Sequence, residues 1–226
     1  MQFNDLEIFT RKEPLCEELV PYVFDGPLGP ALKHPLVFCV FGLDLERAGL
    51  YNAQFKAKKE RVDDAIANKR WSEALVFYER PHRLEFFLKI SNQMTDEDYW
   101  QTLAWIITDS ENLWQYDAQL RLVLTDPTRF STRYLLMDES EGEALAELPD
   151  EFPIWRGCQW RNRFGLSWTT DEETALWFAN RLNPKKPIIH SGIISKQDVI
   201  AHLCGRNEQE ILAIHTKIRN RKLTRL

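Results

Sequence analysis

The chain has 226 residues, of which 44% are hydrophobic and 28% charged, a composition typical of a globular protein with a substantial core. Its formal net charge of -5 argues against broad, non-specific binding of nucleic acid, which needs an extended basic surface. No apolar run approaches the roughly eighteen residues of a membrane span, and the sequence shows no secretory leader. Its four scattered cysteines fit a reducing compartment. We therefore expect a cytoplasmic protein that does not bind membranes.

The first 150 residues are predicted to be mainly helical, after an opening segment punctuated by Gly and Pro. The apolar stretch 36–41 is either a buried strand or a short apolar segment. The spacing of apolar residues predicts helices over 56–69, 71–78, 82–90 and 112–124. A further helix is expected after Thr95, whose hydroxyl suits an N-cap and is followed by three acidic residues. The acidic stretch 138–148 is a helix or a linker, and we place the domain boundary after residue 150.

Beyond residue 150 the pattern changes to short strands with one helix. Thr170 to Glu173 forms a capping box that opens this helix. The predicted fold class is therefore α+β, with a helical N-terminal region over residues 1–150 packed on a small β core over residues 151–226. The last ten residues carry five positive charges, which we interpret as a solvated terminus. The predicted strands cover residues 152–156, 165–168, 188–194, 199–203 and 210–214.

Three short motifs stand in order on strand-like segments of the β core. They are Trp-Arg-Gly ending at Gly157, Ser-Trp-Thr-Thr beginning at Ser167, and Glu-Gln-Glu ending at Glu210. Because side chains alternate along a strand, Glu208 and Glu210 are expected to project to the same face. Two carboxylates at the start of a buried strand are electrostatically costly, which indicates a functional role.

The order of these motifs resembles the Arg–Ser–Glu branch of the ADP-ribosyltransferase superfamily. In that branch an Arg lies on the first core strand, a Ser-x-Ser/Thr motif on a later strand leads into a helix, and Glu/Gln-x-Glu begins a late strand. The resemblance covers residues 152–217 and departs from the commoner Ser-Thr-Ser by reading Ser-Trp-Thr. The chain as a whole also resembles bacterial proteins without an assigned target. The resemblance implies an ADP-ribosyltransferase-like split β core that binds NAD⁺ as a co-substrate.

The resemblance implies three catalytic residues. Breaking the glycosidic bond to nicotinamide develops positive charge on the ribose, and Glu210 would stabilise that charge. Ser167 would orient this carboxylate and the ribose by hydrogen bonding. Glu208 would lie nearer the acceptor, as a base or a positioning group.

The resemblance also implies a set of residues that bind the dinucleotide. Arg156 would donate hydrogen bonds to the diphosphate, and Gly157 would let the backbone approach the nicotinamide amide. Ser167, Trp168 and Thr169 would complete this set, with the ring of Trp168 or of Phe164 stacked on nicotinamide; either ring is equally compatible with a core position.

The implied activity is transfer of ADP-ribose from NAD⁺ to an unknown macromolecular acceptor, with release of nicotinamide. Two alternatives stay open: an inactive module of this fold that acts by protein binding, and an enzyme that modifies nucleic acid with its basic tail on the phosphates. The only close His/Cys pair is His202 and Cys204, so no metal site is expected.

Overall fold

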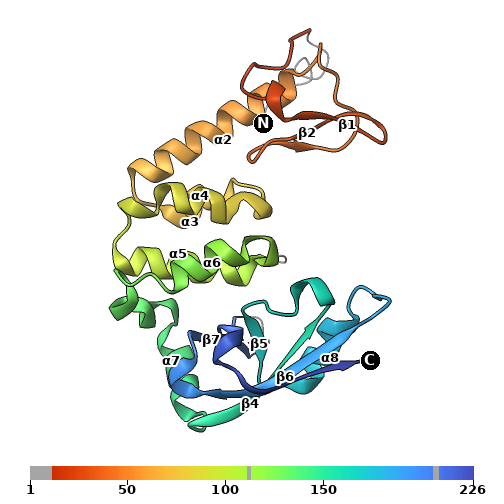
Figure 1. The fold of residues 1–226 in the computed structure, drawn as a ribbon. Helices are drawn as coiled ribbons and strands as arrows, with labels where there is room; N and C mark the ends of the chain where they lie inside the picture. Colours follow the sequence, from red (N-terminus) through yellow and green to blue (C-terminus); the bar gives the residue numbers. More distant parts are fainter. Residues whose placement is uncertain (1–11, 111–112, 206–208) are drawn as a thin grey trace. The chain divides into compact units, whose positions relative to one another are not determined.

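The structure, a computed structural model, describes residues 12–110, 113–205 and 209–226. It combines helices with antiparallel sheets, which confirms the predicted α+β class (Figure 1). By internal packing the chain divides into two units, Met1–Gln93 and Met94–Leu226. The division lies earlier than the predicted boundary after residue 150, so three of the later helices share a unit with the large sheet. In the part of the chain that the structure describes, no helix is long and apolar enough to cross a membrane.

The first unit contains a small antiparallel sheet and a helical segment. The sheet has the order β1-β2-β3, and Gly29 turns the β1–β2 hairpin with a positive φ of 102°. The apolar stretch 36–41 yields only the two-residue strand β3. The elements are β1 (Val23–Gly26), β2 (Gly29–Lys33), β3 (Phe38–Cys39), α2 (Gly49–Ala67), α3 (Trp71–Val76) and α4 (Arg83–Ile90), with short 3-10 turns η2 (Val20–Tyr22), η3 (Arg80–His82) and η4 (Ser91–Gln93).

The second unit opens with three α-helices. The predicted cap is confirmed at α5 (Asp96–Asp109), where the hydroxyl of Thr95 accepts a hydrogen bond from the amide of Asp98. The acidic stretch is a helix, α7 (Glu139–Glu147), closed at its start by a reciprocal capping box between Asp138 and Glu141. Between them lie η5 (Leu113–Tyr116), α6 (Asp117–Leu124) and η6 (Phe130–Leu136), so the helix predicted over 112–124 begins later than expected.

The sheet of the second unit has six antiparallel strands in the order β7-β8-β5-β4-β6-β9. The first, second and fifth of these strands along the chain, β4, β5 and β8, are therefore neighbours in space. The strands are β4 (Glu151–Cys158), β5 (Ser167–Thr169), β6 (Ile188–Ser195), β7 (Ala201–Leu203), β8 (Glu210–Leu212) and β9 (Arg219–Arg225), with η7 (Trp160–Asn162), η8 (Lys196–Asp198) and η9 (His215–Lys217) between them.

Both faces of this sheet are covered by apolar contacts. On one face Leu145 and Leu148 at the end of α7 pack against the main core. On the other face α8 (Glu172–Asn180) brings Ala175 and Ala179 against Ile189 and Trp155. The main core consists of Phe152, Ile154, Trp168, Ile194, Val199, Ile211, Ala213 and Ile218.

Two local predictions in this region are corrected. The N-cap of α8 is Asp171 and not Thr170, because the Asp171 carboxylate accepts from the amides of Glu173 and Thr174, and Asp caps a helix at least as well as Thr. The basic tail, interpreted as a solvated terminus, is exposed but forms a paired strand, β9, beside β6. All its side chains are exposed, and cations on an edge strand oppose pairing with other chains.

Gly157 allows α8 to lie directly on β4. A Cβ built at this position would meet the carbonyl oxygen of Ala175 at 2.0 Å and the amide nitrogen of Ala179 at 2.4 Å. These are backbone atoms, which cannot turn aside as a side chain would. We expect Gly157→Ala to lower the free energy of unfolding by about 3 kcal/mol, because it forces helix and strand apart.

Gly142 in α7 provides the matched control, since nothing lies within 4 Å of a Cβ there. Gly142→Ala should raise the free energy of unfolding by about 0.5–1 kcal/mol, because Gly is unfavourable inside a helix. Urea denaturation of both variants measures the difference. Equal stability of the two would contradict the packing role of Gly157.

Burial lowers the pKa of all five histidines, His34, His82, His190, His202 and His215. In the unfolded chain these imidazoles titrate near about 6.5, so the unfolded state binds more protons than the folded state once the pH falls below that value. Stability is therefore complete above about pH 6.5 and declines as the pH falls towards the lowered pKa values. We expect a lower Tm at about pH 5.5 than at about pH 7.5, measured by thermal denaturation, with a smaller difference in His202→Gln. An unchanged or higher Tm in acid would refute this.

Candidate functional site

A cavity of about 570 Å³ lies within the second unit, on the face of the sheet that carries α8. Arg156, Ser167 and Glu210 all line it, so the three motif residues meet at one site. Leu120 and Leu124 of α6 and Phe178 of α8 supply apolar parts of its wall. The volume falls within the range of about 300–1,000 Å³ that is usual for ligand pockets.

The sheet order explains how residues so far apart along the chain meet. Trp155 on β4 lies opposite Thr169 on β5, and Thr169 lies opposite Glu210 on β8. Directly opposite residues share a face of the sheet, so these three side chains form a row. Ser167 lies two positions from Thr169 and shares this face by alternation. The row places a hydroxyl pair next to one carboxylate.

Arg156 occupies an opening between β4 and β5. The two strands pair only at Trp155 and Thr169. Beyond this point the guanidinium of Arg156 donates to backbone carbonyls in place of a paired strand. Its Nη1 donates to the carbonyl of Ser167, while Nε and Nη2 donate to the carbonyl of Asn162 at 3.2 and 3.1 Å. The second hydrogens on Nη1 and Nη2 form no bond with any described residue and are available to a ligand.

Gly165 makes room for this guanidinium. A Cβ at Gly165 would lie 2.4 Å from Nη2 and 2.7 Å from Cζ of Arg156. Burial lowers the pKa of Arg156, and the neighbouring Cys158, Glu210 and Asp117 oppose that shift. An arginine still keeps its charge at neutral pH. The site therefore holds a fixed cation within electrostatic reach of two carboxylates.

Glu210 is the first residue of β8 and is half-buried at the cavity. The preceding residue, Gln209, has a positive φ of 44° and lies outside the strand, where its side-chain oxygen accepts a hydrogen bond from Thr170. Gln209 is therefore not in the extended conformation that the expected alternation through this position requires. Glu208 itself lies outside the described residues.

The other predicted NAD⁺-binding residues also line the cavity, each with an additional structural contact. Gly157 faces α8, which explains the glycine by packing alone. The ring of Trp168 is only 2% exposed, and its Nε1 donates to the carbonyl of Gly165 at 3.1 Å, so its burial favours the core role over stacking. Thr169 is buried and its hydroxyl accepts from the amide of Asp171.

Three further lining residues were missed by the sequence reasoning. Arg161 is exposed and forms no ion pair with a described residue. Asp117 is held by Arg121 through bonds of 2.6 and 3.1 Å, and Arg121 also donates to the carbonyl of Phe164 at 2.5 Å. Trp114 is 48% exposed. Asp117 and Trp114 come from the helical segment, which no motif connected to the β core, whereas Arg161 lies between two motifs.

Metal ligation has no support in the part of the chain with described coordinates, where no three His, Cys, Asp or Glu side chains form a group that could hold an ion. His202 and Cys204 do lie together, with Nε2 and Sγ 3.8 Å apart. The amide of Cys204 donates to Glu141 at 2.7 Å, so that carboxylate serves a structural contact between α7 and the end of β7.

No model of a known protein family matches the chain, and no curated protein or solved structure is significantly similar to it. The function must therefore be argued from the geometry of the cavity.

The contacts of Arg156 predict a strong effect on stability. Arg156→Ala leaves the carbonyls of Asn162 and Ser167 without their charged donor, and we expect it to lower the free energy of unfolding by roughly 2–3 kcal/mol. Arg156→Lys should not restore it, because one ammonium lacks the planar donor fork.

Arg161→Ala is the control for this prediction. Arg161 lies in η7, next to the Asn162 that Arg156 contacts, and forms no ion pair with a described residue. Its effect on the free energy of unfolding should stay within about 0.5 kcal/mol. Urea titration of the three variants gives the comparison. A fully stable Arg156→Ala protein would show that the guanidinium does not hold this part of the sheet.

Proposed function

We propose that the protein is a mono-ADP-ribosyltransferase that moves ADP-ribose from NAD⁺ to a macromolecular acceptor and releases nicotinamide. The observation that carries the proposal is that Arg156, Ser167 and Glu210 line one cavity. Each motif also has the position that the resemblance implies. Arg156 lies on the first strand of the sheet, Ser167 begins the strand that leads into α8, and Glu210 begins a late strand.

The register supports the Ser-Trp-Thr motif despite its departure from Ser-Thr-Ser. Ser167 and Thr169 face the cavity row, whereas Trp168 between them turns into the core on the opposite face. The side chain of the middle residue thus packs mainly in the core, not in the row of hydroxyls and carboxylate. A large apolar side chain there strengthens the core without removing either hydroxyl.

The cavity offers groups suited to each part of the dinucleotide. The remaining N–H groups of Arg156 and the guanidinium of Arg161, which forms no ion pair with a described residue, fit a diphosphate, which prefers fixed, charge-assisted donors. The exposed ring of Trp114 at the wall fits a planar base or nicotinamide. Thr169 lies directly opposite Glu210 on the sheet, and Ser167 lies two positions along the same face, so both hydroxyls and the carboxylate are offered to the ribose hydroxyls.

The proposed step breaks the bond between the ribose C1′ and the nicotinamide nitrogen. Nicotinamide leaves as a neutral molecule with the bonding electron pair, and an acceptor nucleophile bonds to C1′ and gives up its proton. Positive charge develops on the ribose as the old bond lengthens. Glu210 stabilises that charge because its carboxylate is held in a partly buried site.

Glu210→Gln tests this role, since the amide keeps the shape and loses the charge. We expect nicotinamide release from NAD⁺ to fall by about 10²–10³-fold, as for the loss of one preorganised electrostatic group, while NAD⁺ binding changes little. Glu143→Gln, an exposed position in α7, is the control and should match the wild type.

Four outcomes separate the possible functions. Release that depends on Glu210 supports the transferase, and equal release by wild type and Glu210→Gln contradicts the role of this carboxylate. NAD⁺ binding without any release, with protein and nucleic-acid acceptors supplied, indicates an inactive module of the same fold. A wild type that does not bind NAD⁺ refutes the proposal.

A further inference from the structure

A column of four stacked planar side chains lies beside the cavity. The guanidinium of Arg163 lies 3.8 Å from the ring centroid of Trp160 and 4.2 Å from that of Phe164. The Phe164 ring is in turn stacked on His215, with centroids 4.7 Å apart and planes at 25°. Arg161 and Asn162 in the same loop line the cavity, so the column adjoins the proposed active site.

Two aromatic rings of the column are more exposed than core side chains. Trp160 is 56% exposed and Phe164 is 40% exposed. Arg163 forms no ion pair with a described carboxylate; its Nη1 donates to the carbonyl of Trp160. Arg163 and His215 occupy the two faces of Phe164, so the exposed ring of Trp160 is the open aromatic face of the column, and no described carboxylate pairs with Arg163.

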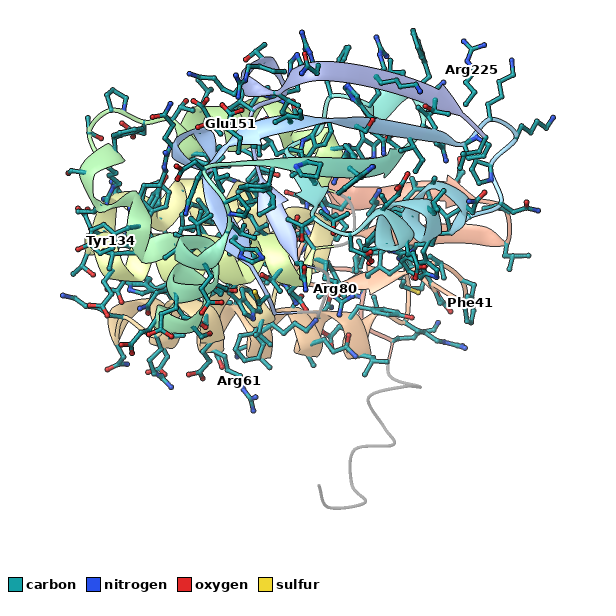
Figure 2. All side chains as sticks on the ribbon, turned by 90° about the horizontal axis from the view of Figure 1, so that it is seen from below. Phe41, Arg61, Arg80, Tyr134, Glu151 and Arg225 are labelled. Carbon is teal, nitrogen blue, oxygen red and sulfur yellow. The ribbon has the colours of Figure 1, made fainter. Side chains whose placement is uncertain are left out.

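Strand β9 extends this cationic character along the sheet edge. The Nη1 of Arg221 donates to the carbonyl of His215 at 3.4 Å. His190 connects the loop with the strand, because its Nδ1 lies 2.9 Å from the carbonyl oxygen of Arg163 and it pairs with Leu223 of β9. By alternation Arg225 projects to the same face as Arg221, and Figure 2 shows Arg225 at the outer end of the strand.

Not every cation of β9 is available to a ligand. Arg219 is paired with Glu151, and Lys217 in the turn η9 just before the strand lies 3.2 Å from Asp198. Arg221 and Arg225 have no carboxylate partner among the described residues. The column residues Trp160, Arg163, Phe164 and His215, together with Arg221 and Arg225, are called the stack surface below.

We propose that the stack surface binds single-stranded nucleic acid, with bases on the aromatic column and phosphates on the cations. Stacking platforms combined with a basic track are the features by which single strands are bound, because only unpaired bases expose their faces. The inference rests on the proposed function in one respect: it names the acceptor class presented to the cavity. The formal net charge of -5 excludes a broad basic surface but not this local one.

Fluorescence anisotropy with a labelled single-stranded oligonucleotide of about 20 nucleotides tests the inference, at low salt and without NAD⁺. Wild type should bind, and Trp160→Ala should raise Kd by about 10-fold because one stacking partner is lost. Arg221→Gln/Arg225→Gln should reduce the slope of log K against log salt by about 1.4, the value for two phosphate contacts on a single strand. Thermal melts establish that each variant folds.

Trp177→Ala is the matched control. Like Trp160, Trp177 on α8 is well exposed, at 57%, and has a guanidinium near its ring, that of Arg181 at 5.4 Å. Trp177 is not part of the stack surface. Its loss should leave Kd unchanged. The inference would be overturned if the wild type did not bind the strand, or if Trp160→Ala and Trp177→Ala raised Kd equally. It would also be overturned if the wild type bound a duplex of the same sequence more tightly than the single strand.

Two further arms separate this inference from the proposed function. Saturating NAD⁺ should not displace the strand; displacement would assign the column to the base of the dinucleotide and overturn the inference. Glu210→Gln should bind the strand like the wild type. If the strand does not bind, nicotinamide release still tests the transferase. If nicotinamide is not released, strand binding still tests this inference.

Discussion

The site depends on the hydrogen bonds of one guanidinium, that of Arg156. It donates to backbone carbonyls where a neighbouring strand would otherwise pair. Arg156 donates to the carbonyls of Ser167 and Asn162 at the point where β4 and β5 cease to pair. A continuous ladder there would close the sheet. The charged donor satisfies these carbonyls while the strands diverge, and the cavity lies against this opening.

The sheet order turns this opening into a site. Because β4, β5 and β8 are adjacent, a cation, a pair of hydroxyls and a carboxylate meet although about fifty residues separate the first from the last. Two glycines allow the close approaches: Gly165 admits the guanidinium, and Gly157 admits α8. These contacts give Arg156 a structural role besides the ligand-binding role proposed for it.

The sequence predicted most of the elements, because apolar periodicity and caps are local signals. The motif residues Arg156, Ser167 and Glu210 could be chosen because the order of their motifs resembles that of a known superfamily. The turn at Gln209 could not be foreseen, since a positive φ at a non-glycine residue has no sequence signal. Trp114 and Asp117 escaped because tertiary packing alone brings α6 and η5 to the cavity. The pairing of β9 with β6 was not predicted, because the charge pattern of the tail indicated a solvated terminus.

The most direct measurement is a crystal structure determined with NAD⁺ or a non-hydrolysable analogue at saturating concentration. The account predicts a dinucleotide in the cavity, with its diphosphate against Arg156 and Arg161 and its nicotinamide ribose beside Ser167 and Glu210. A cavity that stays empty under these conditions, or a dinucleotide bound at another surface, would contradict it.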